Sequence, residues 1–140
     1  MGSRARGAPT PMHRLRSVQA PAAVVMIRPH AFRPNAETAG DNHFQAQAPD
    51  GDALSVAARA CLEVSAAAER LQPEGVRVHL FDDDGERDTP DSVFPNNWFS
   101  THPGGHVAIY PMALPSRRRE RRSDVIELLK AQHRVQDVID

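Results

Sequence analysis

The sequence contains little cysteine, little unbalanced charge and no long apolar run. Its 140 residues include one cysteine, Cys61, which excludes an intramolecular disulfide framework and a cysteine-rich zinc site and favours a cytoplasmic location. The formal net charge of −1 argues against a general polyanion binder, because such domains usually have a strongly basic balance. No apolar run approaches the ~20 residues that a membrane helix needs. The length fits one domain.

The composition along the chain separates a leader from one α/β domain. Residues 1–20 are rich in Arg, Gly and Pro and lack periodicity, which predicts a disordered leader. Residues 21–140 contain the periodic segments and are predicted to form the ordered part. The first apolar run leads directly into Arg28 and Pro29 without a small-residue cleavage site, so it favours a strand over a secretory signal.

Apolar spacing predicts the first three elements. Residues 23–28 form a short run rich in β-branched side chains, which indicates a buried strand. Helical spacing then begins, with Asp52 as its N-cap and an apolar stripe that includes Cys61 and Leu62. Residues 76–81 alternate and predict a strand with one face in the core and His79 on the opposite face.

The second half of the chain is predicted to contain a hairpin, a helix and the start of a new strand. The segment Pro103-Gly104-Gly105 supplies the backbone freedom that a tight hairpin turn requires. A helix is predicted from about residue 116 to residue 133, and the final residues suit another strand. The complete order is β, α, β, β, β, α, followed by the opening of a further strand.

The segment "DTPDSVFPNNWFSTH", residues 88–102, is the strongest candidate for chemistry. The carboxylate of Asp91 is suited to accept from the planar donors of a guanidinium, and Phe94 supplies a π face for a flat cation. The amides of Asn96 and Asn97 can donate and accept with defined direction. A Pro-Asn-Asn turn explains the same residues without any ligand. Chemistry alone leaves the pocket and the turn equally open.

Other reactive or charged residues are better explained by structure. Cys61 lies on the apolar stripe of the first helix, where a free cysteine is predicted to be a buried, inert hydrophobe. The seven histidines fit no metal-binding spacing, so no metal is expected. The run from Arg117 to Arg122 is predicted to be an exposed, charged helix face, and nucleic-acid binding is the weaker interpretation. Because the run lies at the start of a helix, where the helix dipole disfavours cations, a specific pairing role is also open.

Four separated motifs resemble one enzyme group. They are "MIRPHAFRPNAETAGDNHFQ", "PDSVFPNNWFSTH", "GHVAIYPM" and "SRRRERRSDVIELL". The stretch from Val24 to Asp140 is similar to amidinotransferase and arginine-deiminase-related proteins of the pentein superfamily, most closely to the citrulline-utilisation-type hydrolases. The resemblance implies an α/β fold, a five-bladed propeller of ββαβ-type units, of which this chain would form about two blades. No metal or organic cofactor is implied.

The resemblance also implies roles for the residues singled out by chemistry. The stretch "PDSVF" resembles the corresponding segment of dimethylarginine dimethylaminohydrolases, so Asp91 and Phe94 would line the substrate site. Asn96 and Asn97 would take the places of two acids. The thiolate and the histidine that act on the guanidinium carbon lie in the C-terminal half of the family, so the resemblance implies no catalytic residue in this chain.

The sequence therefore leads to two expectations. The chain is expected to be the N-terminal part of a guanidine-modifying hydrolase or amidinotransferase, inactive by itself, that helps to bind a small guanidino or ureido substrate. The alternative is a non-catalytic ligand-binding or assembly module, which associates with itself or with a C-terminal half through open blade edges. Neither nucleic acid nor membrane is expected as a partner.

Overall fold

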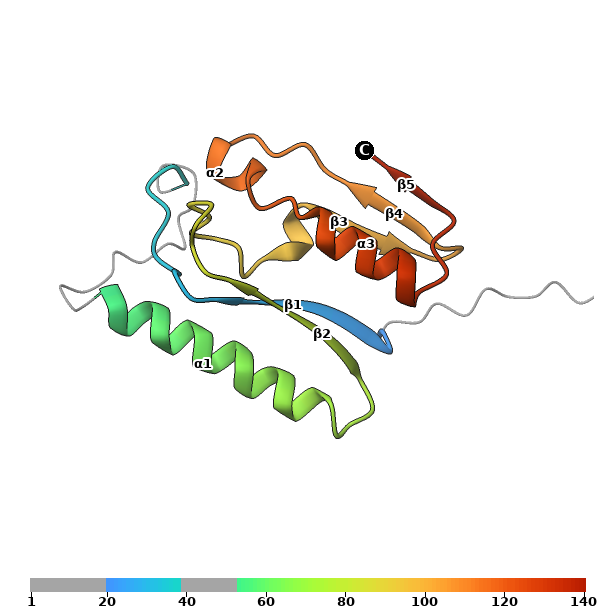
Figure 1. Cartoon of the computed structure of the whole chain (residues 1–140), viewed down its shortest axis with the longest axis horizontal. Coiled ribbons are helices and arrows are strands. Elements are labelled where there is room, and N and C mark those ends of the chain that lie inside the picture. Colours follow the sequence, from blue (N-terminus) through green and yellow to red (C-terminus); the bar gives the residue numbers. More distant parts are fainter. Residues whose placement is uncertain (1–19, 39–52) are drawn as a thin grey trace, which may run out of the picture.

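The first sheet of the protein is a parallel strand pair covered by one long helix. The computed structural model describes residues 20–38 and 53–140 (Figure 1). Strand β1 (Ala23–Pro29) pairs with β2 (Arg77–Asp83) in the register that joins Ala23 to Arg77. Helix α1 (Ala53–Leu71) connects the two strands and packs along them. This helix crossover is the kind of connection that a parallel pair requires.

The second sheet is a hairpin extended by a parallel strand. Strands β3 (Phe99–His102) and β4 (His106–Ile109) are antiparallel, and β5 (Asp137–Ile139) pairs parallel with β4. The hairpin turn contains Gly104 and Gly105 at φ angles of 93° and 87°, a region that favours glycine. The remaining elements are the 3-10 helix η1 (Pro95–Asn97) before the sheet, and α2 (Pro115–Arg118) and α3 (Ser123–Gln132) between β4 and β5.

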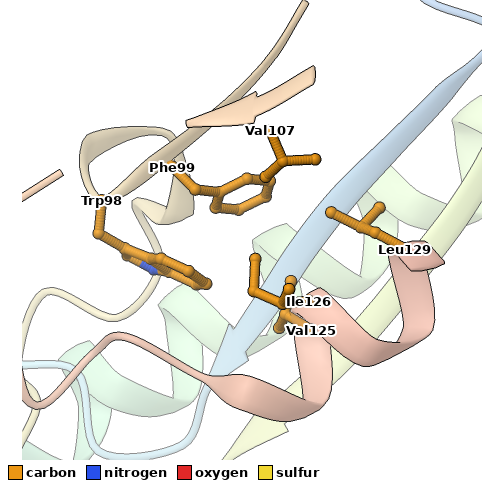
Figure 2. Close-up of a cluster of buried hydrophobic side chains, with 6 residues drawn as sticks. All are labelled: Trp98, Phe99, Val107, Val125, Ile126 and Leu129. Atoms are coloured by element: carbon orange, nitrogen blue, oxygen red, sulfur yellow. The ribbon is translucent and has the colours of Figure 1, made fainter. Parts of the chain in front are cut away.

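One apolar core joins the two sheets. It is formed by buried side chains of β3, β4 and α3 together with Trp98. In Figure 2, the side chains of α3 face those of Trp98 and the two strands. Its members are Trp98, Phe99, Val107, Val125, Ile126 and Leu129. Val25 of β1 and Phe81 of β2 pack against this core from the first sheet. These two side chains link the cluster to the first sheet, and each large apolar side chain contributes about 1.5–3 kcal/mol when fully buried.

The predicted order of elements and the mixed α/β class are confirmed, with one break. The helix expected over residues 116–133 is two helices, because the backbone is extended at Arg122 (φ −116°, ψ 116°). The five-bladed propeller and the count of two blades stay predictions. The leader predicted for residues 1–20, except Ala20, and the predicted N-cap Asp52 lie outside the described residues.

Two predictions of side-chain environment were wrong. His79, predicted to face away from the core, is 7% exposed because both faces of β2 are covered. Its Nε2 atom lies 2.8 Å from Nε2 of His133 just beyond α3. Leu62, predicted on the buried stripe of α1, is 69% exposed, whereas Ala57 and Ala68 of the same predicted stripe are buried. In the part of the chain that the structure describes, no helix is long and apolar enough to cross a membrane.

Candidate functional site

A polar cluster surrounds Asp91, whose side chain is 14% exposed. Its Oδ2 atom accepts a hydrogen bond of 2.7 Å from Nδ2 of Asn35, and lies 3.2 Å from Nη1 of Arg117. The partners come from segments far apart in the sequence: the loop after β1, the turn before η1, and α2. Because an ion pair with low exposure is screened less than a surface pair, this contact holds the Asp91 carboxylate in place.

Consecutive backbone turns orient the predicted site residues. The amide N–H of Phe94 donates to the carbonyl of Asp91 at 3.1 Å, and that of Asn97 donates to the carbonyl of Phe94 at 3.1 Å. Pro95 occupies the first position of η1, where its missing N–H costs no hydrogen bond. The turns leave Asp91 half-buried in the cluster and Phe94 44% exposed. The segment therefore forms the predicted turn and also holds the Asp91 carboxylate in the polar cluster.

Ser116 extends the cluster to the loop after β1. Its hydroxyl donates to Oε2 of Glu37 at 2.6 Å, and its backbone N–H donates to the same oxygen at 3.2 Å. These hydrogen bonds lower the pKa of Glu37 because they stabilise its charged form. Nδ2 of Asn35 also lies 3.2 Å from Oγ of Ser116. The loop is thereby fixed against the start of α2.

A buried acid completes the cluster. Glu120 is 2% exposed, and its Oε2 atom lies 3.2 Å from Nε of Arg117 without hydrogen-bond geometry. Burial raises the pKa of Glu120 to about 7, and the nearby charge of Arg117 opposes this rise. The prediction that residues 117–122 form an exposed helix face was therefore wrong for these two residues, which are buried. Arg117 instead has the specific pairing role that the sequence left open, with Asp91 and Glu120 as its partners.

A cavity of about 620 Å³ adjoins the same turn. Val93, Pro95 and Asn96 form one wall of it, and strands β1, β3 and β4 form the others. His79 and His133 also line the cavity. Burial lowers the pKa of His79, and electrostatic interactions with His133 and Arg77 lower it further. The turn of residues 91–97 therefore separates a charged cluster from a largely apolar hollow.

Comparison with known families assigns the chain. A sequence model of the family described as N,N dimethylarginine dimethylhydrolase, eukaryotic, matches residues 28–140. The chain belongs to this family. The matched range includes Asn35, Asp91 and Arg117, which form the polar cluster. No curated protein and no solved structure matches the chain.

Membership of the dimethylarginine dimethylhydrolase family confirms the wider group to which the motifs pointed, the pentein superfamily. It supports a hydrolase that acts on guanidino compounds. The closer likeness to citrulline-utilisation-type hydrolases and the assignment to an N-terminal part stay predictions. Within residues 20–38 and 53–140, no group of three or more His, Cys, Asp or Glu side chains could hold a metal ion.

The four predicted site residues of this dimethylarginine dimethylhydrolase family member do not share one hollow. Asp91 lies in the polar cluster, and the ring of Phe94 is exposed beside it. Asn96 lines the cavity, and its Nδ2 donates to Oδ1 of Asn97 at 3.2 Å. Both amides are exposed. One turn therefore carries all four residues, with Asp91 in the polar cluster and Asn96 at the adjoining cavity.

Sequence reasoning missed the partners that hold Asp91. Asn35 lies within the first family-like motif, and Arg117 lies within the fourth. Each is a polar residue that hydrophobic periodicity does not explain. The signal that could have found them is the co-occurrence of the motifs, since motifs from one family site meet in space. Glu120 lies in the same fourth motif as Arg117, but an acid within an arginine run is also typical of an exposed, charged surface.

Proposed function

We propose that this chain supplies substrate-binding residues to a hydrolase that acts on the guanidino group of methylated arginines, with Asp91 contacting the cationic group. The geometry of Asp91 is the observation that carries the proposal. Both of its contacts, to Asn35 and Arg117, are made by Oδ2, and Oδ1 has no partner among the described residues. A fixed carboxylate with one free oxygen suits a single charge-assisted hydrogen bond from a guanidinium N–H.

Phe94 fits the apolar part of such a ligand. Its ring is 44% exposed and belongs to the same turn as Asp91. A flat cation can lie on this face, and methyl groups on the cation add apolar contact. The arrangement accounts for methylated guanidino groups better than for a simple ammonium ion, which has neither a plane nor methyl groups.

The neutral side chains nearby widen the range of ligands. Arg117 already balances the charge of Asp91, and Asn96 and Asn97 are uncharged amides. The site therefore offers less negative charge than a group of several carboxylates. Amide groups both donate and accept, so an uncharged ureido group such as that of citrulline is also a suitable ligand. The proposal therefore includes citrulline-like compounds as ligands.

The chain is proposed to bind such a ligand without turning it over. A thiolate mechanism needs a cysteine and an acid–base partner at the reacting carbon. The contacts of Cys61 are made with His30 and not with Asp91, Asn35 or Arg117. The nucleophile implied by the family resemblance therefore has no counterpart at this cluster within the described residues.

Calorimetry with N,N-dimethylarginine, arginine and citrulline tests the proposal. Asp91→Asn is expected to weaken dimethylarginine binding about tenfold or more, because a hydrogen bond to a charged group contributes about 1.5–3 kcal/mol. Phe94→Leu keeps an exposed apolar side chain without the π face and is expected to weaken binding about threefold, in line with an exposed cation–π contact of about 0.5–1 kcal/mol. Glu69→Gln, an equal charge change on the exposed side of α1, is the control.

The outcomes separate binding from catalysis. The role of the cluster would be refuted if the folded wild-type protein bound none of the three ligands. It would also be refuted if the Asp91→Asn and Phe94→Leu variants bound dimethylarginine as tightly as wild type. Turnover that disappears in Cys61→Ala would instead refute the claim that the chain is inactive. Single-residue fluorescence of Trp98, which is buried in the core, verifies folding of each variant.

An assembly module is the second candidate, and the strand arrangement favours it. Among the described residues, β1 pairs with β2 along one edge only, and residues 23–27 of β1 line the cavity. An unpaired edge beside an apolar hollow is a surface on which another strand can add. Sedimentation velocity over a concentration series tests this candidate: one monomeric species at every concentration would contradict self-association.

A further inference from the structure

Cys61, His30 and Asp82 meet at the surface from three separate parts of the first sheet and its helix. Sγ of Cys61 on α1 lies 3.7 Å from Nδ1 of His30, which follows β1. The other ring nitrogen of His30, Nε2, lies 2.7 Å from Oδ1 of Asp82 on β2. The parallel register of β1 and β2 carries His30 and Asp82 to the same end of the strand pair.

The carboxylate determines which nitrogen of His30 can act as a base. An ionised carboxylate only accepts hydrogen bonds, so the proton of neutral His30 resides on Nε2, where it is donated to Asp82. Nδ1 then has a free lone pair, and it is this atom that faces the sulfur. Nε of Arg28 lies 3.0 Å from the same Asp82 oxygen and helps to hold that carboxylate in place.

The three side chains are accessible. Cys61 is partly buried on α1, and the side chains of His30 and Asp82 are about half exposed. The prediction that Cys61 is buried was therefore wrong. A nucleophile, a base within reach of it and a third group that orients the base form the arrangement that activates a thiol.

We propose that Cys61 is a reactive thiol and a modification site for small, soft electrophiles. In the reaction, the proton moves from Sγ to Nδ1 of His30, and the resulting thiolate attacks an electrophilic carbon. A sulfur–carbon bond forms while the bond from that carbon to its leaving group breaks, and the leaving group departs with the electron pair. His30 accepts the proton, and Asp82 is a positioning residue that stabilises the imidazolium.

This site is separate from the proposed ligand site. No hydrogen bond or ion pair within the described residues links Cys61, His30 or Asp82 side chains to Asp91, Asn35 or Arg117. The inference therefore does not depend on whether the chain binds a guanidino compound. It concerns covalent modification of Cys61, whereas the proposed ligand site binds its ligand reversibly.

Alkylation by iodoacetamide, followed by intact mass spectrometry, tests the proposal. Because Cys61 is the single cysteine, one added acetamide group reports on this residue alone. An ordinary thiol is only a few per cent thiolate at pH 7, so the folded protein is expected to react at least about fivefold faster than glutathione at that pH. The advantage is expected to disappear at about pH 10, where ordinary thiols are also ionised.

Variants assign the roles. His30→Gln is expected to reduce the rate at pH 7 to that of glutathione, and Asp82→Asn to an intermediate value, with little change for either at about pH 10. His102→Gln, a change of an exposed histidine on β3, is the matched control and keeps the wild-type rate. Wild-type protein that reacts no faster than glutathione at pH 7, or a His30→Gln variant that reacts as fast as wild type, would overturn the proposal.

Discussion

Replacing Glu120 by glutamine should change how the stability of the protein depends on pH. Glu120 is 2% exposed, and neither carboxyl oxygen makes a hydrogen bond within the described residues. Burial raises its pKa from 4.5 to about 7, although Arg117 favours the charged form. One pKa unit corresponds to about 1.4 kcal/mol, so ionising Glu120 in the folded protein costs about 3 kcal/mol relative to the unfolded chain.

The sign of this effect follows from the direction of the shift. The folded-state pKa lies above the ordinary value, so the unfolded chain loses its proton first. The contribution of neutral Glu120 is complete below about pH 4.5 and is lost as the pH rises to about 7. Glutamine has no proton to lose. The free energy of unfolding of Glu120→Gln minus that of wild type should therefore increase by about 3 kcal/mol between about pH 4.5 and about pH 8.

Urea unfolding followed by fluorescence measures this difference directly. Trp98 is the single tryptophan and is buried in the core beside α3, so its emission reports unfolding of the region that contains Glu120. Glu127→Gln, a change of an exposed glutamate paired with Lys130, serves as the control and should show no comparable trend. A difference between Glu120→Gln and wild type that stays constant over this pH range would refute the argument from burial.

Two further predictions concern the histidine pair and the hairpin. Because burial and His133 lower the pKa of His79, its contribution to stability is present above about pH 6.5 and is lost as the pH falls below that value. His79→Phe should remove this loss in the free energy of unfolding measured with urea. An unchanged decrease in that free energy below about pH 6.5 would contradict the prediction. Gly105→Ala should lower the unfolding free energy by at least about 2 kcal/mol, since its φ is 87° and a Cβ would meet the carbonyl of Arg134. Gly75→Ala, at φ 84° in open space, should cost only about 1 kcal/mol; equal losses for the two would contradict the steric argument.

Much of the fold could be predicted because periodicity records which residues are buried. The alternation and β-branched residues of β1 and β2, the glycines of the β3–β4 turn and the apolar stripe of α3 each determine their own element. The break before α3 could not be predicted, since residues 117–122 are good helix formers locally. The extended residue, Arg122, donates to the backbone carbonyl of Asp82 at 2.7 Å, a contact with a segment distant in sequence.

The roles of the four candidate site residues stay predictions, and the contacts around them could not be predicted from the sequence. The motif drew attention to Asp91 and Phe94, and the structure places both on one turn. Nothing in the local sequence indicates that an internal guanidinium, Arg117, already pairs with Asp91. His79 and Cys61 were misjudged for the same reason, because a residue's environment on a strand or helix face depends on which elements cover it. His133 and His30 supply those environments from distant positions.

The strand pairings also determine the sequence of events by which this chain acquires its structure. The β3–β4 hairpin closes over three residues, and such hairpins form within about ten microseconds. The parallel pairs β1–β2 and β4–β5 instead require the chain to return across whole helices, α1 in the first case and α2 with α3 in the second. Loop closure of that kind is slower because entropy is lost before the pairing is gained. The hairpin thus offers an edge to which β5 can add, whereas β1 and β2 pair with each other in a separate sheet.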